Sequence, residues 1–95
     1  LTKFIWEADV FPVANQSSMR ARVSGGGAGF NLFVINSKGN LLVGEQTVGK
    51  LEFGKWSSFR IVCNLIKETY SVYINSKLAA EKYIKAADEL VASNN

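Results

Sequence analysis

The sequence contains no histidine, and this absence removes several kinds of functional site at once. A Ser-His-Asp triad and a histidine-ligated zinc site both require an imidazole, so neither can be built from this chain. Cys63 is the single cysteine, so no internal disulfide can form. No apolar run approaches the roughly 20 residues with which a helix spans a bilayer. The sequence therefore predicts no membrane-spanning helix.

The composition is that of a folded domain. Hydrophobic residues make up 47% of the chain and charged residues 20%, which is typical of a globular protein and not of a disordered tail. The net charge is +3, but the lysines are scattered and lie mostly beside expected turns, where charge usually serves solvation. Surfaces that bind nucleic acid normally combine clustered cations with stacking aromatic residues. We therefore do not expect nucleic acid as a partner.

Alternation of apolar and polar residues predicts strands along most of the chain. The clearest case is a hairpin in which Phe59, Ile61 and Cys63 alternate with polar residues and are followed by a second alternating arm. Such a pair belongs naturally to an antiparallel β-sandwich. The expected strands cover residues 2–11, 19–23, 30–35, 40–43, 46–50, 58–65 and 70–75. The expected core residues are Trp6, Phe30, Leu32, Phe59, Ile61, Cys63, Tyr70, Val72 and Ile74.

The pattern changes near the C-terminus. Ile84, Ala87, Leu90 and Val91 fall at helical spacing, with good helix formers between them. The sequence therefore predicts a short amphipathic helix from Ile84 to Ala92. The fold class that follows is all-β with this one C-terminal helix, in a single domain over residues 1–95.

Residues 54–81 carry a recognisable pattern. It consists of Gly-x-Trp, a strand that ends near an Asn, and then Thr-Tyr-x-Val-Tyr-Ile-Asn followed by Lys-Leu. This pattern resembles the back-sheet hairpin of the concanavalin A-like lectin/glucanase (laminin G-like) jelly rolls. Asn75 and Ser76 stand where Asp and Gly are usual, and Ser at the glycine's left-handed position is strained. The matching residues are Gly54, Trp56, Asn64, Thr69, Tyr70, Val72, Tyr73, Ile74, Asn75, Lys77 and Leu78.

The resemblance implies a jelly-roll-like sandwich at the cell surface or outside the cell, with carbohydrate recognition or adhesion as its function. A complete jelly roll of this kind needs roughly twelve or more strands, so 95 residues are few for one. We therefore expect that the chain can be part of a larger protein.

Catalysis is not expected from the acidic residues. Glu7 and Asp9 point the same way on one strand, which is the arrangement of paired carboxylates in retaining glucanases of the resembling fold. Those enzymes place a third acid where this chain has Pro12. The eight acidic residues are otherwise dispersed, which disfavours a calcium site. We expect no enzymatic activity, no metal and no cofactor.

The third strand is apolar on both faces, and this predicts a second covered surface. Phe33 and Ile35 point away from the first core, and a four-residue loop at 66–69 sets Val62 opposite Tyr73 on the same side. Such a face needs a cover. The candidates are the C-terminal helix, strands outside this chain, a second copy of the protein, or a ligand.

Two functions follow from these expectations. The first is a non-catalytic carbohydrate-recognition or adhesion module, with an aromatic platform and polar fringe if that face is open. The second is a structural or assembly domain that self-associates through the apolar sheet face. The expected partner is accordingly a glycan or another protein, including a second copy in a homodimer. The candidate ligand-binding residues are Tyr73, Phe33, Arg60, Arg20 and Asn31.

Overall fold

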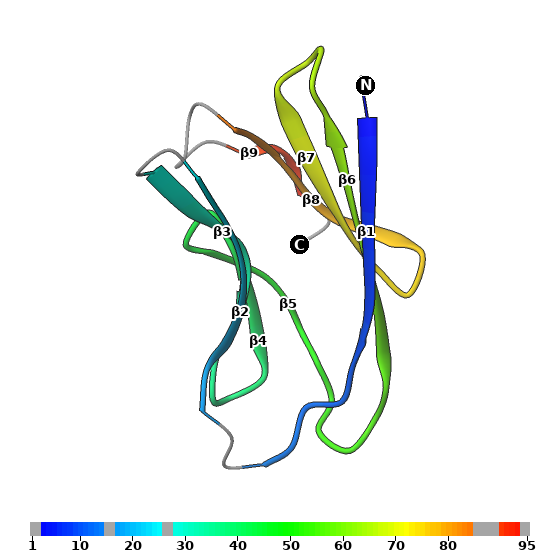
Figure 1. The fold of residues 1–95 in the computed structure, drawn as a ribbon. Coiled ribbons are helices and arrows are strands. Elements are labelled where there is room, and N and C mark those ends of the chain that lie inside the picture. The colour runs from blue at the N-terminus through cyan, green and yellow to red at the C-terminus, as the bar shows by residue number, and fades with distance from the viewer. Residues whose placement is uncertain (1–2, 15–16, 26–27, 85–89, 94–95) are drawn as a thin grey trace.

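The structure is a computed structural model that describes residues 3–14, 17–25, 28–84 and 90–93. The described residues form nine strands and no helix (Figure 1). The strands are β1 (Lys3–Val10), β2 (Met19–Gly25), β3 (Ala28–Ile35), β4 (Asn40–Val43), β5 (Gln46–Lys50), β6 (Ser57–Asn64), β7 (Thr69–Ile74), β8 (Lys77–Tyr83) and β9 (Leu90–Ser93).

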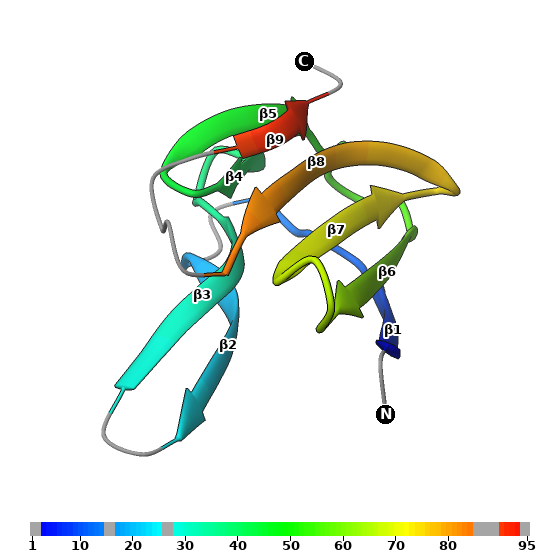
Figure 2. The ribbon, with the colours of Figure 1, turned by 90° about the horizontal axis from the view of Figure 1, so that it is seen from above.

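The strands build two antiparallel sheets that face each other as a β-sandwich. One sheet has the order β1-β6-β7-β8-β9 and the other the order β2-β3-β4-β5. Figures 1 and 2 show the two sheets as separate layers, with the chain crossing between them after β1 and after β5. The all-β sandwich predicted from the alternation of residues is therefore confirmed.

The predicted C-terminal helix is not found among the described residues. Leu90–Ser93 form β9, which pairs antiparallel with β8, while residues 85–89 lie outside the described ranges. The helical prediction is thus wrong over its last residues. A short isolated helix gains little free energy in water, whereas the free edge of β8 offers backbone hydrogen-bond partners.

The core lies between the sheets and agrees largely with the predicted set. Leu32, Phe59, Ile61, Cys63, Tyr70 and Val72 are all buried, and Ile74 packs against them from a half-buried position. Trp6 is an exception, because it is 40% exposed. Its strand is at the edge of the sheet, and its ring contacts Phe33 with the centroids 6.2 Å apart. The side chain of Phe30 lies outside what the structure describes.

Phe33 and Ile35 correct the prediction for the third strand. Both belong to the core, Phe33 being 4% exposed and stacked on Phe59 with the ring centroids 4.6 Å apart. Leu32 is buried as well. The register between β2 and β3 shifts, so that Ala21 faces Phe33 and Arg22 faces Asn31, which leaves Leu32 without a partner. Such a bulge lets two consecutive side chains be buried.

The β6–β7 hairpin has a different loop from the expected one. Arg60, not Val62, lies opposite Tyr73, and the loop is Leu65–Glu68. The Asn64 Oδ1 accepts hydrogen bonds from the backbone N–H groups of Ile66 and Lys67, which closes the loop early. The observed pairing differs from the expected one by two residues, so each side chain stays on the face of the sheet that was predicted for it. Val62 and Tyr73 still point away from the core.

The β7–β8 turn consists of Asn75 and Ser76, with φ angles of 49° and 70°. The expectation that Ser76 occupies a left-handed position is confirmed. Two positive φ angles are typical of the two-residue turns that suit the twist of a hairpin. Asn75 also ties this turn to β6, because its Oδ1 accepts from the N–H of Ser58 at 2.9 Å and its N–H donates to the Ser58 carbonyl at 2.8 Å.

Candidate functional site

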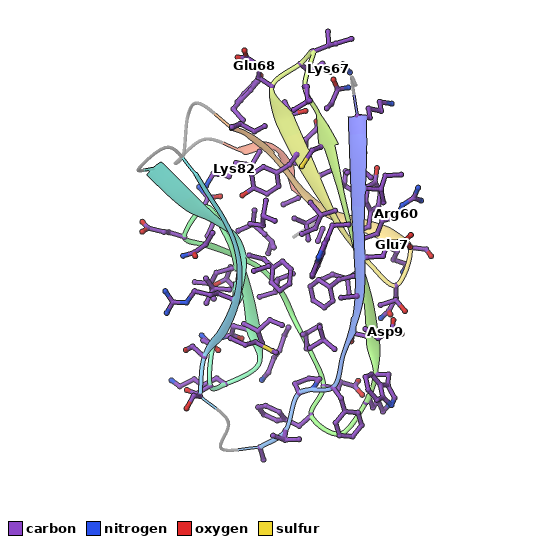
Figure 3. All side chains as sticks on the ribbon, viewed as in Figure 1. Glu7, Asp9, Arg60, Lys67, Glu68 and Lys82 are labelled. Carbon is purple, nitrogen blue, oxygen red and sulfur yellow. The ribbon has the colours of Figure 1, made fainter. Side chains whose placement is uncertain are left out.

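Tyr73 and Arg60 are the two predicted site residues that the structure brings together. They are cross-strand partners on the outer face of the five-stranded sheet, and Glu7 of β1 lies opposite Arg60 on its other side. Figure 3 shows Glu7 and Arg60 directed away from the other sheet. Arg60 is exposed and Tyr73 is half-buried. A polar and aromatic row therefore crosses this face.

The other three predicted residues lie elsewhere. Phe33 is in the core, so its ring cannot serve as a surface platform. Arg20 is exposed on β2 and Asn31 is half-buried on β3, both in the four-stranded sheet. The carbonyl of Asn31 accepts a hydrogen bond from the Tyr70 hydroxyl at 3.3 Å. This bond connects β3 of one sheet to β7 of the other. The five residues do not form one site.

A groove of about 440 Å³ lies between β5 and the β7–β8 turn, beside the start of β6. Its volume is in the range of small-molecule sites. Its lining combines the buried apolar side chains of Val48, Leu51 and Ala79 with polar and charged side chains. The lining residues are Val48, Gly49, Lys50, Leu51, Glu52, Lys55, Trp56, Ser57, Ile74, Asn75, Lys77 and Ala79.

Trp56 is the most exposed aromatic residue in the described part of the chain. It is 69% exposed at the groove, and the Phe11 ring packs against it with a centroid separation of 5.2 Å and an angle of 57° between the planes. The N–H of Gly54 donates to the Pro12 carbonyl at 2.8 Å, which joins the two connections that carry these rings. Figure 1 shows both connections at the same end of the sandwich. The indole is therefore held in place while most of its surface faces solvent.

Cations outnumber anions in the groove. Lys50, Lys55 and Lys77 line it together with one carboxylate, Glu52. Lys55 Nζ lies 2.7 Å from Glu52 Oε2. This hydrogen bond and the opposite charges lower the pKa of Glu52 and raise the pKa of Lys55. Both groups are exposed to solvent, so the pair contributes little to the stability of the fold.

Trp56 is not among the predicted site residues, although the sequence carries a signal for it. Phe59, Ile61 and Cys63 point inward, so even-numbered residues of this segment point outward, as Ser58 and Arg60 do. Trp56 continues this alternation one residue before β6 begins. A large aromatic side chain in phase with the polar face indicates a functional surface. Tyr73 of β7 also lies on the outer face, opposite Arg60, but it is less exposed.

The paired carboxylates Glu7 and Asp9 are both exposed on the outer face of β1. Asp9 Oδ1 accepts a hydrogen bond from the Ser58 hydroxyl at 3.1 Å, and Glu7 lies opposite Arg60. Within the described ranges, no group of three His, Cys, Asp or Glu residues is placed to hold a metal ion. In the same part of the chain, no helix has the length and apolar character needed to cross a bilayer.

Comparisons with models of protein families, with curated proteins and with solved structures found no match for this chain.

Proposed function

We propose that this protein is a non-catalytic carbohydrate-recognition or adhesion module that binds its glycan in the groove beside Trp56. The observation that carries the proposal is the 69% exposed indole in the lining of a groove that also contains buried apolar side chains and polar or charged ones. A sugar ring has an apolar face and a hydroxyl edge. An aromatic ring packs against the apolar face, while amide, hydroxyl and charged groups form hydrogen bonds with the hydroxyl edge.

The rigidity of the platform supports this assignment. Phe11 packs against Trp56, and the Gly54–Pro12 hydrogen bond fixes the two connections relative to each other. Asn75 is held by both its backbone and its side chain to Ser58. A site that is already ordered before the ligand arrives loses less conformational entropy on binding.

The family resemblance adds a second line of support. Trp56, Asn75 and Lys77 belong to the pattern shared with the concanavalin A-like jelly rolls, and all three line the groove. Carbohydrate binding, the jelly-roll type of sandwich and a location outside the cell or at its surface are carried over by analogy, since a fold does not determine a function.

A glycan array with two matched variants tests the proposal. Trp56→Ala removes the exposed indole, whereas Tyr73→Ala removes the half-buried phenol on the outer face of the five-stranded sheet. Binding should disappear in Trp56→Ala and persist in Tyr73→Ala. The opposite result would move the site to the row of Tyr73 and Arg60, and an array on which the unmodified protein binds nothing would reject the proposal.

Self-association is the second candidate function, and the outer face of the five-stranded sheet favours it. Ile5 is 50% exposed there, and four further apolar or aromatic side chains of the same face are partly accessible to solvent. They are Val62, Tyr73, Leu78 and Tyr83. The molecular mass in solution, measured by analytical ultracentrifugation, shows directly whether the protein self-associates. A dimer that becomes a monomer in Ile5→Lys would support a structural or assembly role.

A further inference from the structure

The lysines of the Trp56 groove come from both sheets. Lys50 ends β5 and Lys77 begins β8, so each sheet contributes one lysine to the lining of the groove. Neither lysine has an ion pair within the described residues, whereas Lys55 is paired with Glu52 at 2.7 Å. The groove therefore has in its lining two lysines without an ion pair among the described residues, together with the exposed indole of Trp56.

We infer that the saccharide bound in this groove is acidic and carries carboxylate or sulfate groups, an inference that rests on the proposed function. The sugar ring lies on Trp56, and its anionic groups face Lys50 and Lys77. A neutral sugar would leave these two ammonium groups with water alone. Glu52 is the single anion of the lining, and its bond to Lys55 reduces its repulsion of such a ligand.

Single-stranded nucleic acid also combines stacking with positive charge, but it fits this geometry less well. Proteins that bind it without sequence preference use several aromatic residues along a track of several nucleotides. Here the groove has one aromatic residue in its lining and a volume of about 440 Å³. A short acidic oligosaccharide is the better match in size.

Binding is measured with three tetrasaccharides: one of galactose, one of galacturonate and one of sulfated galactose. At low ionic strength the galacturonate or the sulfated form should bind several-fold and up to about twenty-five-fold more tightly than the neutral form, since each of the two exposed charge pairs contributes up to about fivefold. The preference should shrink as salt is added, because exposed charges are screened. Comparing the two acidic forms distinguishes carboxylate from sulfate.

Charge variants separate a direct contact from the overall positive charge of the protein. Lys50→Gln/Lys77→Gln should bring the affinity for the acidic form down to that for the neutral form. The control Lys38→Gln/Lys67→Gln removes two exposed lysines outside the groove and should leave the preference unchanged. Glu52→Gln should raise the affinity for the acidic form several-fold, which a merely structural role of this residue does not explain.

Each outcome decides between the two claims. If neutral and acidic forms bind equally and both require Trp56, carbohydrate recognition stands and the acidic ligand is rejected. The same holds if the control pair of lysines lowers affinity as much as the groove pair. If no saccharide binds, both claims fail. If oligothymidylate binds through Trp56 in place of any saccharide, the groove is a nucleic-acid site and the inference is overturned.

Discussion

Four non-glycine residues in the described part of the chain have positive φ, and each is in a hairpin turn: Glu45, Glu68, Asn75 and Ser76. Asn tolerates the left-handed region better than most residues, because its short side chain can bond locally to the backbone. Ser76, at φ 70°, lacks this advantage. The two-residue turn that strains Ser76 also sets the register of β7 and β8. It places Asn75 and Lys77 in the lining of the groove.

Ser76→Gly should therefore stabilise the protein. Relief of the left-handed strain should outweigh the extra freedom of the unfolded chain and raise the free energy of unfolding by up to about 1 kcal/mol. Urea denaturation measures this. The matched control is Ser37→Gly, an exposed turn position that is not among the residues of positive φ, where the free energy of unfolding should fall. Equal losses in both variants would contradict the strain at Ser76.

Among the elements, the strands whose residues alternate strictly were predictable from the sequence and the others were not. In β6 the buried Phe59, Ile61 and Cys63 are separated by polar or half-buried residues, so the inward face was identified correctly. The third strand is apolar at consecutive positions, so its pattern does not distinguish the two faces. A bulge at Leu32, which depends on pairing with β2, then decides which residues are buried. Tertiary pairing likewise outweighed the helical spacing at the C-terminus.

Phe33→Ala tests the corrected face of β3. Phe33 stacks on Phe59 in the core, so its loss should lower the free energy of unfolding by about 3–5 kcal/mol. Tyr73→Ala, on the outer face, should have a clearly smaller effect because Tyr73 is only half-buried. Chemical denaturation of both variants gives the comparison. If Phe33→Ala were the milder change, Phe33 would belong to an exposed face, as the alternation first suggested.

For the molecule as a whole, the buried thiol of Cys63 and the buried phenol of Tyr70 make the free energy of unfolding depend on pH. Burial raises the pKa of the Cys63 thiol above its ordinary value of 9.0. Burial raises the pKa of Tyr70 above 10.0 as well, and Cys63 adds to this rise. Both groups stay protonated in the folded state at a pH where the unfolded chain already loses its protons. Their contribution to stability is therefore complete below about pH 9 and is lost as the pH rises further.

The free energy of unfolding should accordingly decrease from pH 8.5 to pH 10.5. Urea denaturation at steps across this window measures the slope. Cys63→Ala should flatten the first part of the decline, where the thiol of the unfolded chain ionises, although the variant is less stable at every pH. A stability that stays constant or rises across the window would show that neither group is protected from solvent.

The candidate site shows how far sequence reasoning reaches at this scale. Arg60 and Tyr73 share a face, as the alternation of their strands predicts. Arg20 and Asn31 belong to the other sheet. The alternation of residues does not show which strands pair in one sheet, so this separation could not be predicted. The groove joins β5 to the β7–β8 turn, which lie more than twenty residues apart in sequence. Only the packing of the two sheets brings Lys50, Trp56 and Lys77 together.

The most direct test of the Trp56 groove is a titration followed by NMR, with the indole N–H signals as probes. The chain has two tryptophans, and Trp56→Phe assigns their signals. On addition of the galactose or the galacturonate tetrasaccharide, the Trp56 indole and the backbone amides of Lys50 and Asn75 should shift. The Trp6 indole, which packs against Phe33 away from the groove, should not move. Shifts confined to Arg60 and Tyr73, or no shifts with either saccharide, would contradict the assignment of the groove as the binding site.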